Sequence, residues 1–215
     1  MEWPVLMTRL GEGMLVSVEI FFLTLLFSLP LGLLVAFGRM SKNLLLRNII
    51  KLYISVMRGT PLILQLMVVY FGPYFIFGMP TPHRFLATII AFVLNYAAYF
   101  AEIFRAGIQS IDRGQYEAAK TLGMTYVQTM RRIILPQVVR RVLPPISNET
   151  ITLVKDTSLI YVLAMNDLLR TTRSLVQRDF NTTPFIVAAV FYLLMTLVLT
   201  WLFEWLERKY AVYDK

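Results

Sequence analysis

Four polar residues interrupt a largely apolar stretch in the C-terminal half of the 215-residue sequence: Asn148, Glu149, Thr152 and Asp156. In a helix, Asn148, Thr152 and Asp156 would follow one another along one face, with Glu149 beside them. An ionised side chain at a bilayer centre costs about 2.5 to 3.5 kcal/mol on insertion scales, so such groups usually face a partner or a water-filled cavity. The spacing therefore predicts a polar stripe whose carboxylates can accept hydrogen bonds from a cationic group.

A second interpretation stays open for Asp156, which together with Lys155 could pair with other helices or lie near the membrane interface. Asn95, in an earlier apolar stretch, is a further candidate for the same polar site. Glu102 and Arg105 are three residues apart, and we expect them to form an intrahelical ion pair rather than a binding site.

Several kinds of chemistry are excluded by composition. The sequence has no cysteine and one histidine, His83, so no metal site is expected. It contains no G-x-x-x-x-G-K-[ST] loop and no Gly-Lys pair, so the chain is not expected to bind nucleotide phosphates. No Ser/His/Asp constellation is present either. We therefore predict no catalytic residue and no cofactor on this chain.

The elements that must position these residues are expected to be membrane helices. The chain is 57% hydrophobic with a mean hydropathy of +0.63, which exceeds what a soluble domain of this size needs. A span requires about 20 apolar residues, and residues 14–38, 49–77, 85–104 and 184–206 meet this. Residues 142–165 form a doubtful fifth span, because they contain Pro144, Pro145 and the polar stripe. No linker or repeat divides residues 1–215, so a single transmembrane domain is expected.

The distribution of basic residues predicts the topology. With five helices and the N-terminus outside, most Lys and Arg residues fall in inside segments, within 39–58, 105–141 and 208–215. The outside segments hold Arg9, Arg84, Arg170, Arg173 and Arg178. Four helices would move residues 170–178 inside and the C-terminus outside, so the count favours five. Because the basic residues lie between apolar runs, the net charge of +8 is explained by topology rather than by nucleic acid.

The segment between the third and fourth spans carries the most specific motif. Asp112 could cap a helix with Gln115 completing a capping box, and one apolar face is expected at Ala119, Gly123, Val127, Met130 and Ile134. On periodicity alone this could be an amphipathic connector on the membrane surface. The residues also read E-A-A from Glu117 to Ala119, then Gly123, then I-x-L-P ending at Pro136.

This pattern resembles the EAA loop of binding-protein-dependent ABC importer permeases. In that family the loop forms a cytoplasmic coupling helix that docks on the ATPase subunit, and the resemblance implies this role for Glu117, Ala118, Ala119, Leu122 and Gly123. Small Ala118 and Ala119 would allow close approach of a partner, and Gly123 would permit a bend. Pro136 is expected to end the loop helix before the next span.

A second motif, Arg58, Gly59, Thr60 and Pro61, is similar to the R-G-T-P segment of the polar amino acid permeases, which handle histidine, arginine, glutamine or cystine. Residues 101–107 and 155–159 extend the likeness over nearly the whole chain. From the residues alone, Gly59 and Pro61 predict a helix break at the membrane boundary, whose freed backbone groups need partners. The break could line the inner end of a pathway.

The resemblance implies a bacterial inner-membrane, multi-pass subunit that imports polar or cationic amino acids. Its expected partners are two cytoplasmic ATPase subunits that hold ATP and Mg²⁺, a second permease, identical or homologous, an extracytoplasmic solute-binding protein and lipid. It also implies that Glu149 and Asp156 line the substrate cavity, with Asn95, Asn148 and Thr152 as further contacts. The competing interpretation is a self-sufficient secondary transporter, which leaves the motif from Glu117 to Pro136 unexplained.

Overall fold

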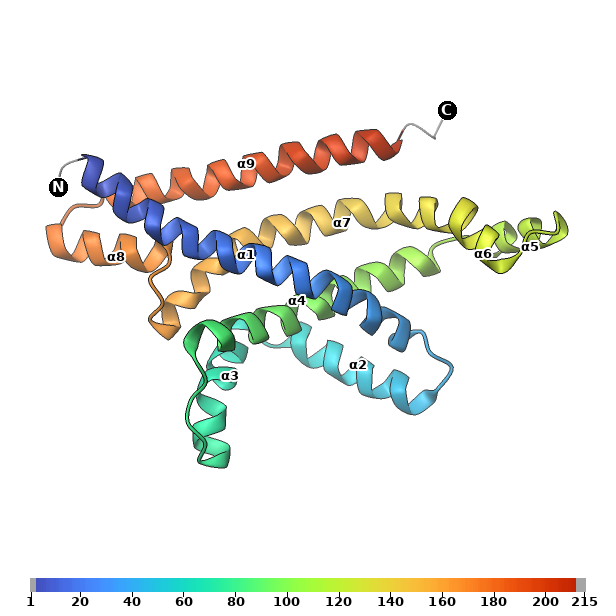
Figure 1. Ribbon diagram of the computed structural model, residues 1–215, viewed down its shortest axis with the longest axis horizontal. Helices are drawn as coiled ribbons and strands as arrows, with labels where there is room; N and C mark the ends of the chain where they lie inside the picture. The colour runs from blue at the N-terminus through green and yellow to red at the C-terminus, as the bar shows by residue number, and fades with distance from the viewer. Residues whose placement is uncertain (1–2, 212–215) are drawn as a thin grey trace.

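The computed structural model describes residues 3–211, and this part of the chain is built of helices without strands. Four long helices run lengthwise through the molecule: α1 (Trp3–Arg39), α4 (Arg84–Gln109), α7 (Leu135–Asp156) and α9 (Thr183–Ala211) (Figure 1). Short helices α5 (Arg113–Thr121) and α6 (Tyr126–Thr129) lie at one end, and α8 (Leu168–Asp179) lies at the other. We call these two ends of the molecule the α5–α6 end and the α8 end.

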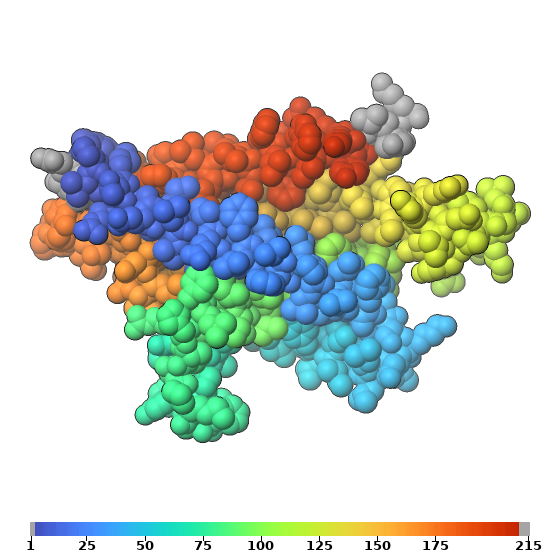
Figure 2. Space-filling model, viewed as in Figure 1, coloured from blue at the N-terminus to red at the C-terminus, as the bar shows by residue number. Residues whose placement is uncertain are grey.

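Three of the described helices, α1, α4 and α9, are long and apolar enough to cross a membrane. The expected span at 49–77 is two helices, α2 (Leu44–Gly59) and α3 (Leu62–Phe77), which meet at an angle of 110°. The pair makes at most a fourth span, so the expected count of five is not reached by length and composition. Figure 2 shows α3 as an arm that projects from the body of the molecule.

The doubtful fifth stretch is a long helix despite its two prolines. α7 continues through Pro144 and Pro145 to Asp156, and a 3₁₀ turn (Thr157–Leu163) follows it. The helix packs against both α4 and α9, which are span candidates. Its polar residues keep its mean hydropathy below that of a lipid-exposed span, although it lies alongside these two helices.

Close packing of α1 on α4 makes the largest helix contact. The buried side of α1 is lined by small residues, among them Ser17, Thr24, Ser28 and Gly32, and small residues are what lets helix backbones approach in membranes. Large side chains from α4, including Phe92, Tyr96 and Phe100, fill the adjoining core. This packing fixes α4 as the central helix against which the site is assembled.

Gly32→Val is expected to destabilise the chain by about 1–3 kcal/mol, because an added Cβ at Gly32 would lie 2.8 Å from Phe100 Cβ and 3.1 Å from the Ala97 carbonyl oxygen. The matched control is Gly11→Val in the same helix, where nothing lies within 4 Å of an added Cβ. Thermal unfolding of both variants in mild detergent would test this. Equal shifts of the two midpoints would contradict the close contact of α1 with α4.

A buried aspartate, Asp167, caps the N-terminus of α8. Asp167 accepts hydrogen bonds from the backbone N–H groups of Leu169 and Arg170, at 3.0 and 3.2 Å, and so caps α8. Its backbone carbonyl would lie 2.9 Å from a Cβ at Gly13, which requires glycine in α1 at this crossing. Burial raises the pKa of the Asp167 carboxyl to about 6.

Candidate functional site

The break between α2 and α3 occurs at the predicted motif. α2 ends at Gly59, Thr60 has an extended backbone, and Pro61 immediately precedes α3. Proline cannot donate the backbone hydrogen bond that a continuing helix would need, so the helix stops here. The predicted break is confirmed, and Arg58 is left exposed at the last turn of α2.

Two side-chain amides satisfy the carbonyl oxygens that this break frees. Gln65 Nε2 donates to the carbonyl oxygens of Met57 and Thr60 at 2.9 and 3.1 Å. Asn95 Nδ2 donates to the Met57 carbonyl at 3.0 Å and to Gln65 Oε1 at 2.9 Å. Asn95 was predicted as a substrate contact, and its amide N–H groups are used here to join α4 to both sides of the break. Gln65 was missed, although a lone amide four residues after Pro61 in an apolar run was a usable signal.

Gln65→Leu is expected to cost about 1–3 kcal/mol of stability, because it leaves the Met57 and Thr60 carbonyls short of a donor and removes the acceptor of Asn95. The control is Gln177→Leu, at an exposed position on α8. Thermal unfolding of the purified variants would distinguish them. A Gln65→Leu midpoint equal to that of the control would mean that water replaces the lost amide.

The predicted polar stripe on α7 lies along one side of the helix, but its members differ in exposure. Glu149 and Asp156 are half-buried, whereas Asn148 and Thr152 are exposed, and Thr152 donates its hydroxyl to the Asn148 carbonyl at 2.9 Å. At 100° per residue the four positions span an arc of about 100°, with Glu149 and Asp156 at its more buried edge and Asn148 at its exposed edge. The four residues thus share one side of α7, as their spacing predicts, and their substrate role stays a prediction.

Asp156 has a partner on the central helix. The hydroxyl of Tyr96, which is 2% exposed, donates to Asp156 Oδ2 at 2.7 Å. This contact agrees with the alternative in which Asp156 pairs with another helix, and it does not involve Lys155, which is exposed. Tyr96 could not be singled out from the sequence, because α4 contains several aromatic residues and only the packing of α4 on α7 selects one.

Glu149 lines a cavity of about 550 Å³ between α2, α4 and α7. Charges of both signs surround this space: the carboxylates of Glu102 and Glu149 and the guanidinium groups of Arg58, Arg105 and Arg141. Its volume lies within the range of small-molecule sites. We name it the Glu149 cavity.

Most of these charges have partners within the chain. Arg105 and Glu102 form the predicted intrahelical ion pair, at 2.6 Å, and Arg141 donates to the backbone carbonyl and hydroxyl of Ser110. The Arg58 guanidinium stacks 5.2 Å from the centre of the Tyr99 ring. Among the described residues, Glu149 has neither an ion pair nor a hydrogen bond through its carboxylate. The cavity thus offers a carboxylate acceptor opposite cationic donors, which is the complement of an ammonium and a carboxylate.

The α5–α6 end is a short helical hairpin with a glycine turn. Asp112 caps α5 by accepting from the Gly114 N–H at 2.6 Å, but the expected capping box with Gln115 is absent there and forms instead between Thr125 and Gln128. Gly123 has a φ of +70°, and the N–H of Met124 donates back to the Ala119 carbonyl at 3.0 Å. This is the helix ending for which glycine is favoured, so the predicted bend at Gly123 is confirmed.

This turn exposes apolar side chains. Leu122, Tyr126 and Val127 are 78%, 74% and 70% exposed, and Glu117 and Ala118 are exposed beside them. We call these five residues the tip. Ala119 is fully buried and packs inward, so it cannot be a surface on which a partner docks. The single apolar face expected from Ala119 to Ile134 was wrong, because the turn divides it between separate helices.

Pro136 does not end the loop helix, contrary to expectation. The chain stays helical from Tyr126 through a π-helical turn (Met130–Ile134) into α7, where Pro136 is in the first turn. The N–H of Leu135 donates to the Met130 carbonyl, five residues back. This widened turn shifts the hydrogen-bond register at the position where proline lacks an N–H, which is why the helix can continue.

Known proteins resemble the chain over most of its length. A family model described as "Binding-protein-dependent transport system inner membrane component" matches residues 28–212. The chain is 39% identical over 214 residues to "Probable amino-acid ABC transporter permease protein YckA" of Bacillus subtilis (strain 168), covering 99% of the chain and 92% of that relative. It is 38% identical to "Arginine transport system permease protein ArtQ" of the same organism, covering 92% and 90%.

Among solved structures, the chain is similar to one described as "Crystal structure of an amino acid ABC transporter with histidines". The TM-score is 0.85 at 36% sequence identity, and the match covers 94% of each chain. The similarity therefore extends over the elements that form both the Glu149 cavity and the tip.

Proposed function

Because the chain belongs to the family of binding-protein-dependent transport system inner membrane components, we propose that it is the translocation subunit for polar or cationic amino acids in an ATP-driven importer. The observation that carries the proposal is a cavity lined both by cationic groups and by the Glu149 carboxylate, which has no ion pair among the described residues. An amino acid presents an ammonium and a carboxylate, so both of its charges would find partners in this space. Relatives named for arginine and cystine support the substrate class.

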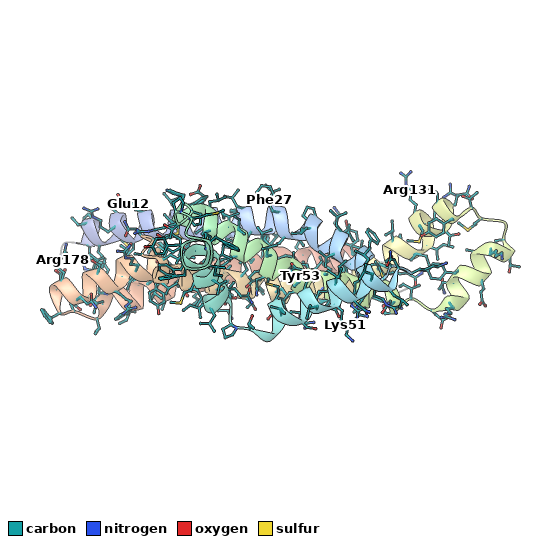
Figure 3. The ribbon with its side chains drawn as sticks, turned by 90° about the horizontal axis from the view of Figure 1, so that it is seen from below. Glu12, Phe27, Lys51, Tyr53, Arg131 and Arg178 are labelled. Atoms are coloured by element: carbon teal, nitrogen blue, oxygen red, sulfur yellow. The ribbon has the colours of Figure 1, made fainter. Side chains whose placement is uncertain are left out.

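In this proposal the α5–α6 end is cytoplasmic and the α8 end is extracytoplasmic. Most of the expected inside basic residues lie towards the first of these ends; Lys215, the last of them, falls outside the described residues. Figure 3 places Lys51 and Arg131 towards the α5–α6 end and Glu12 and Arg178 at the other. α7 then completes the five spans as the fourth in chain order, packed against α4 and α9. The N-terminus is outside and the C-terminus inside, in a bacterial inner membrane.

The tip would dock on a separate cytoplasmic ATPase subunit that holds ATP and Mg²⁺. Large apolar residues exposed on a polar surface are typical of protein contacts, and Leu122, Tyr126 and Val127 project at the free end of the hairpin. Two such ATPases, a second permease, identical or homologous, and a solute-binding protein at the α8 end complete the proposed importer. A secondary transporter would have no use for this exposed tip.

Uptake measurements with the assembled transporter in proteoliposomes would test the proposal. We expect radiolabelled arginine or glutamine to accumulate when ATP is supplied with the solute-binding protein, and accumulation to survive ionophores that collapse ion gradients. Competition by a panel of amino acids would then rank the substrates. Uptake that stops when the gradients collapse while ATP remains would overturn the proposal in favour of a secondary transporter.

A further inference from the structure

A groove of about 660 Å³ lies between the start of α7 and the end of α9. Its charged wall is formed by Arg131, Arg132 and Arg140, and Tyr210 closes it from α9. Leu135 and Val139 add exposed apolar surface one helical turn apart on α7. We call this space the α7–α9 groove. It is separate from the Glu149 cavity and from the tip, with which it shares no lining residue.

Aromatic and basic residues on α9 place the groove at the level of a membrane interface. Trp201 and Trp205 are 68% and 50% exposed, and the Lys209 ammonium lies 5.2 Å from the centre of the Trp205 ring. Tryptophan close to basic residues at a helix end is typical of the boundary between hydrocarbon and headgroups. The preceding turns of α9 expose Leu194, Leu197 and Val198, among other apolar residues that suit acyl chains.

The lining chemistry suits an amphiphile with an anionic head. Arg131 and Arg132 are exposed, and in the described part of the chain neither guanidinium group makes a hydrogen bond or ion pair with another residue. Figure 3 shows Arg131 projecting outward from the surface. Two such guanidinium groups can bind phosphate oxygens through paired N–H donors. The apolar side chains beside them would lie along the first methylenes of an acyl chain.

The geometry points to a site in the α7–α9 groove for the phosphate headgroup of an anionic phospholipid of the inner leaflet. Basic pockets between membrane helices on the cytoplasmic side have this use generally. The inference rests on the proposed orientation of the chain, in which this end faces the cytoplasm. A docked ATPase subunit is the other possible occupant, but the exposed apolar tip lies on the α5–α6 hairpin and not in this groove.

The test uses the purified full chain in a neutral detergent. Native mass spectrometry would measure binding of dioleoyl phosphatidylglycerol and dioleoyl phosphatidylcholine to the native chain and to the double variant Arg131→Gln/Arg132→Gln. The matched control, Lys42→Gln/Lys51→Gln, removes the same number of charges from exposed positions near the same end, outside the groove. Glycerol 3-phosphate, added at the same concentration, serves as a headgroup without acyl chains.

We expect phosphatidylglycerol to bind the native chain and the control more tightly than phosphatidylcholine. The double arginine variant should bind it about 30-fold more weakly, since each basic residue near an anionic surface contributes about fivefold. Unchanged binding in that variant, or equal loss in the lysine control, would overturn the site. Equal binding of glycerol 3-phosphate would mean a free-phosphate site instead.

A further arm separates the lipid from the ATPase subunit. If Arg131→Gln/Arg132→Gln abolishes co-purification of the ATPase while phosphatidylglycerol binding is retained, the groove is a protein contact and the proposal is wrong. Retained co-purification with lost lipid binding supports it. Because lipid binding is read on the chain without uptake, failure of the lipid site would leave the proposed transport function untouched, and failure of uptake would leave the binding result standing.

Discussion

Gly123→Trp is expected to reduce ATP-driven uptake by at least about 30-fold while the chain remains folded and inserted. Gly123 has a φ of +70° and nothing within 4 Å of an added Cβ, so the indole would project into the space where an ATPase subunit is proposed to dock. Displacing a packed contact at the centre of an interface costs about 2–4 kcal/mol, which corresponds to a loss of that size. Uptake and co-purification of the ATPase would both be measured.

Gly78→Trp provides a matched control for the backbone. Gly78 has a φ of +65° and equally open surroundings, but it ends α3, far from the tip. Both substitutions carry the same penalty of about 1 kcal/mol for a side chain in the left-handed region, and only the one at Gly123 alters the tip. Equal losses of uptake would show that strain, and not docking, is responsible. Normal uptake in Gly123→Trp would remove the docking role.

Local features of the chain were predictable where one residue type has one physical consequence. Pro61 lacks an N–H, so the end of α2 could be placed to within a residue, and Gly123 permits a left-handed turn, so the bend in the loop could be placed as well. Pro136 shows the limit of this reasoning. The helix continues past Pro136, as α7 also does past Pro144 and Pro145, and the π-helical turn before Pro136 could not be foreseen from composition.

Contacts between distant segments were not predictable in the same way. Gln65 and Asn95 stand out as amides in apolar helices, but their partners and the partner of Tyr96 depend on how α2, α3, α4 and α7 cross. Periodicity gives the side of a helix on which a residue lies, but not which neighbour covers that side. For this reason the carboxylates of α7 were identified from the sequence, while the hydroxyl of Tyr96 that contacts Asp156 was not.

The continuous helix from Tyr126 to Asp156 joins the tip to the Glu149 cavity. It includes α6, the π-helical turn and α7, and α7 by itself spans roughly 33 Å at 1.5 Å per residue. A rigid element of this kind can carry a displacement of the tip into the region of Glu149 and Asp156. Alternating access in the proposed importer would then follow from movement of α7 against α4.

Glu149→Ala is expected to raise the KM for uptake of a cationic amino acid by roughly 10- to 150-fold, without preventing assembly with the ATPase. The carboxylate lines the cavity and has no hydrogen-bonding partner among the described residues, so an incoming ammonium or guanidinium group would be its partner. A charge-assisted hydrogen bond of that kind contributes about 1.5–3 kcal/mol. Because the carboxylate makes no hydrogen bond or ion pair with the described residues, its removal should leave the folded structure unchanged.

Glu19→Gln is the control, since it removes another carboxylate from a membrane helix, at an exposed position of α1 that borders a different cavity. Glu149→Gln separates charge from hydrogen bonding: it keeps an acceptor oxygen, so it should retain more uptake of neutral glutamine than of arginine. The measurements are initial uptake rates for both amino acids over a range of concentrations. If Glu149→Ala has the kinetics of the native transporter, Glu149 does not bind the substrate. A substrate in this cavity would then have to be held by Arg58 and by charges that already have partners in the chain, those of Glu102, Arg105 and Arg141.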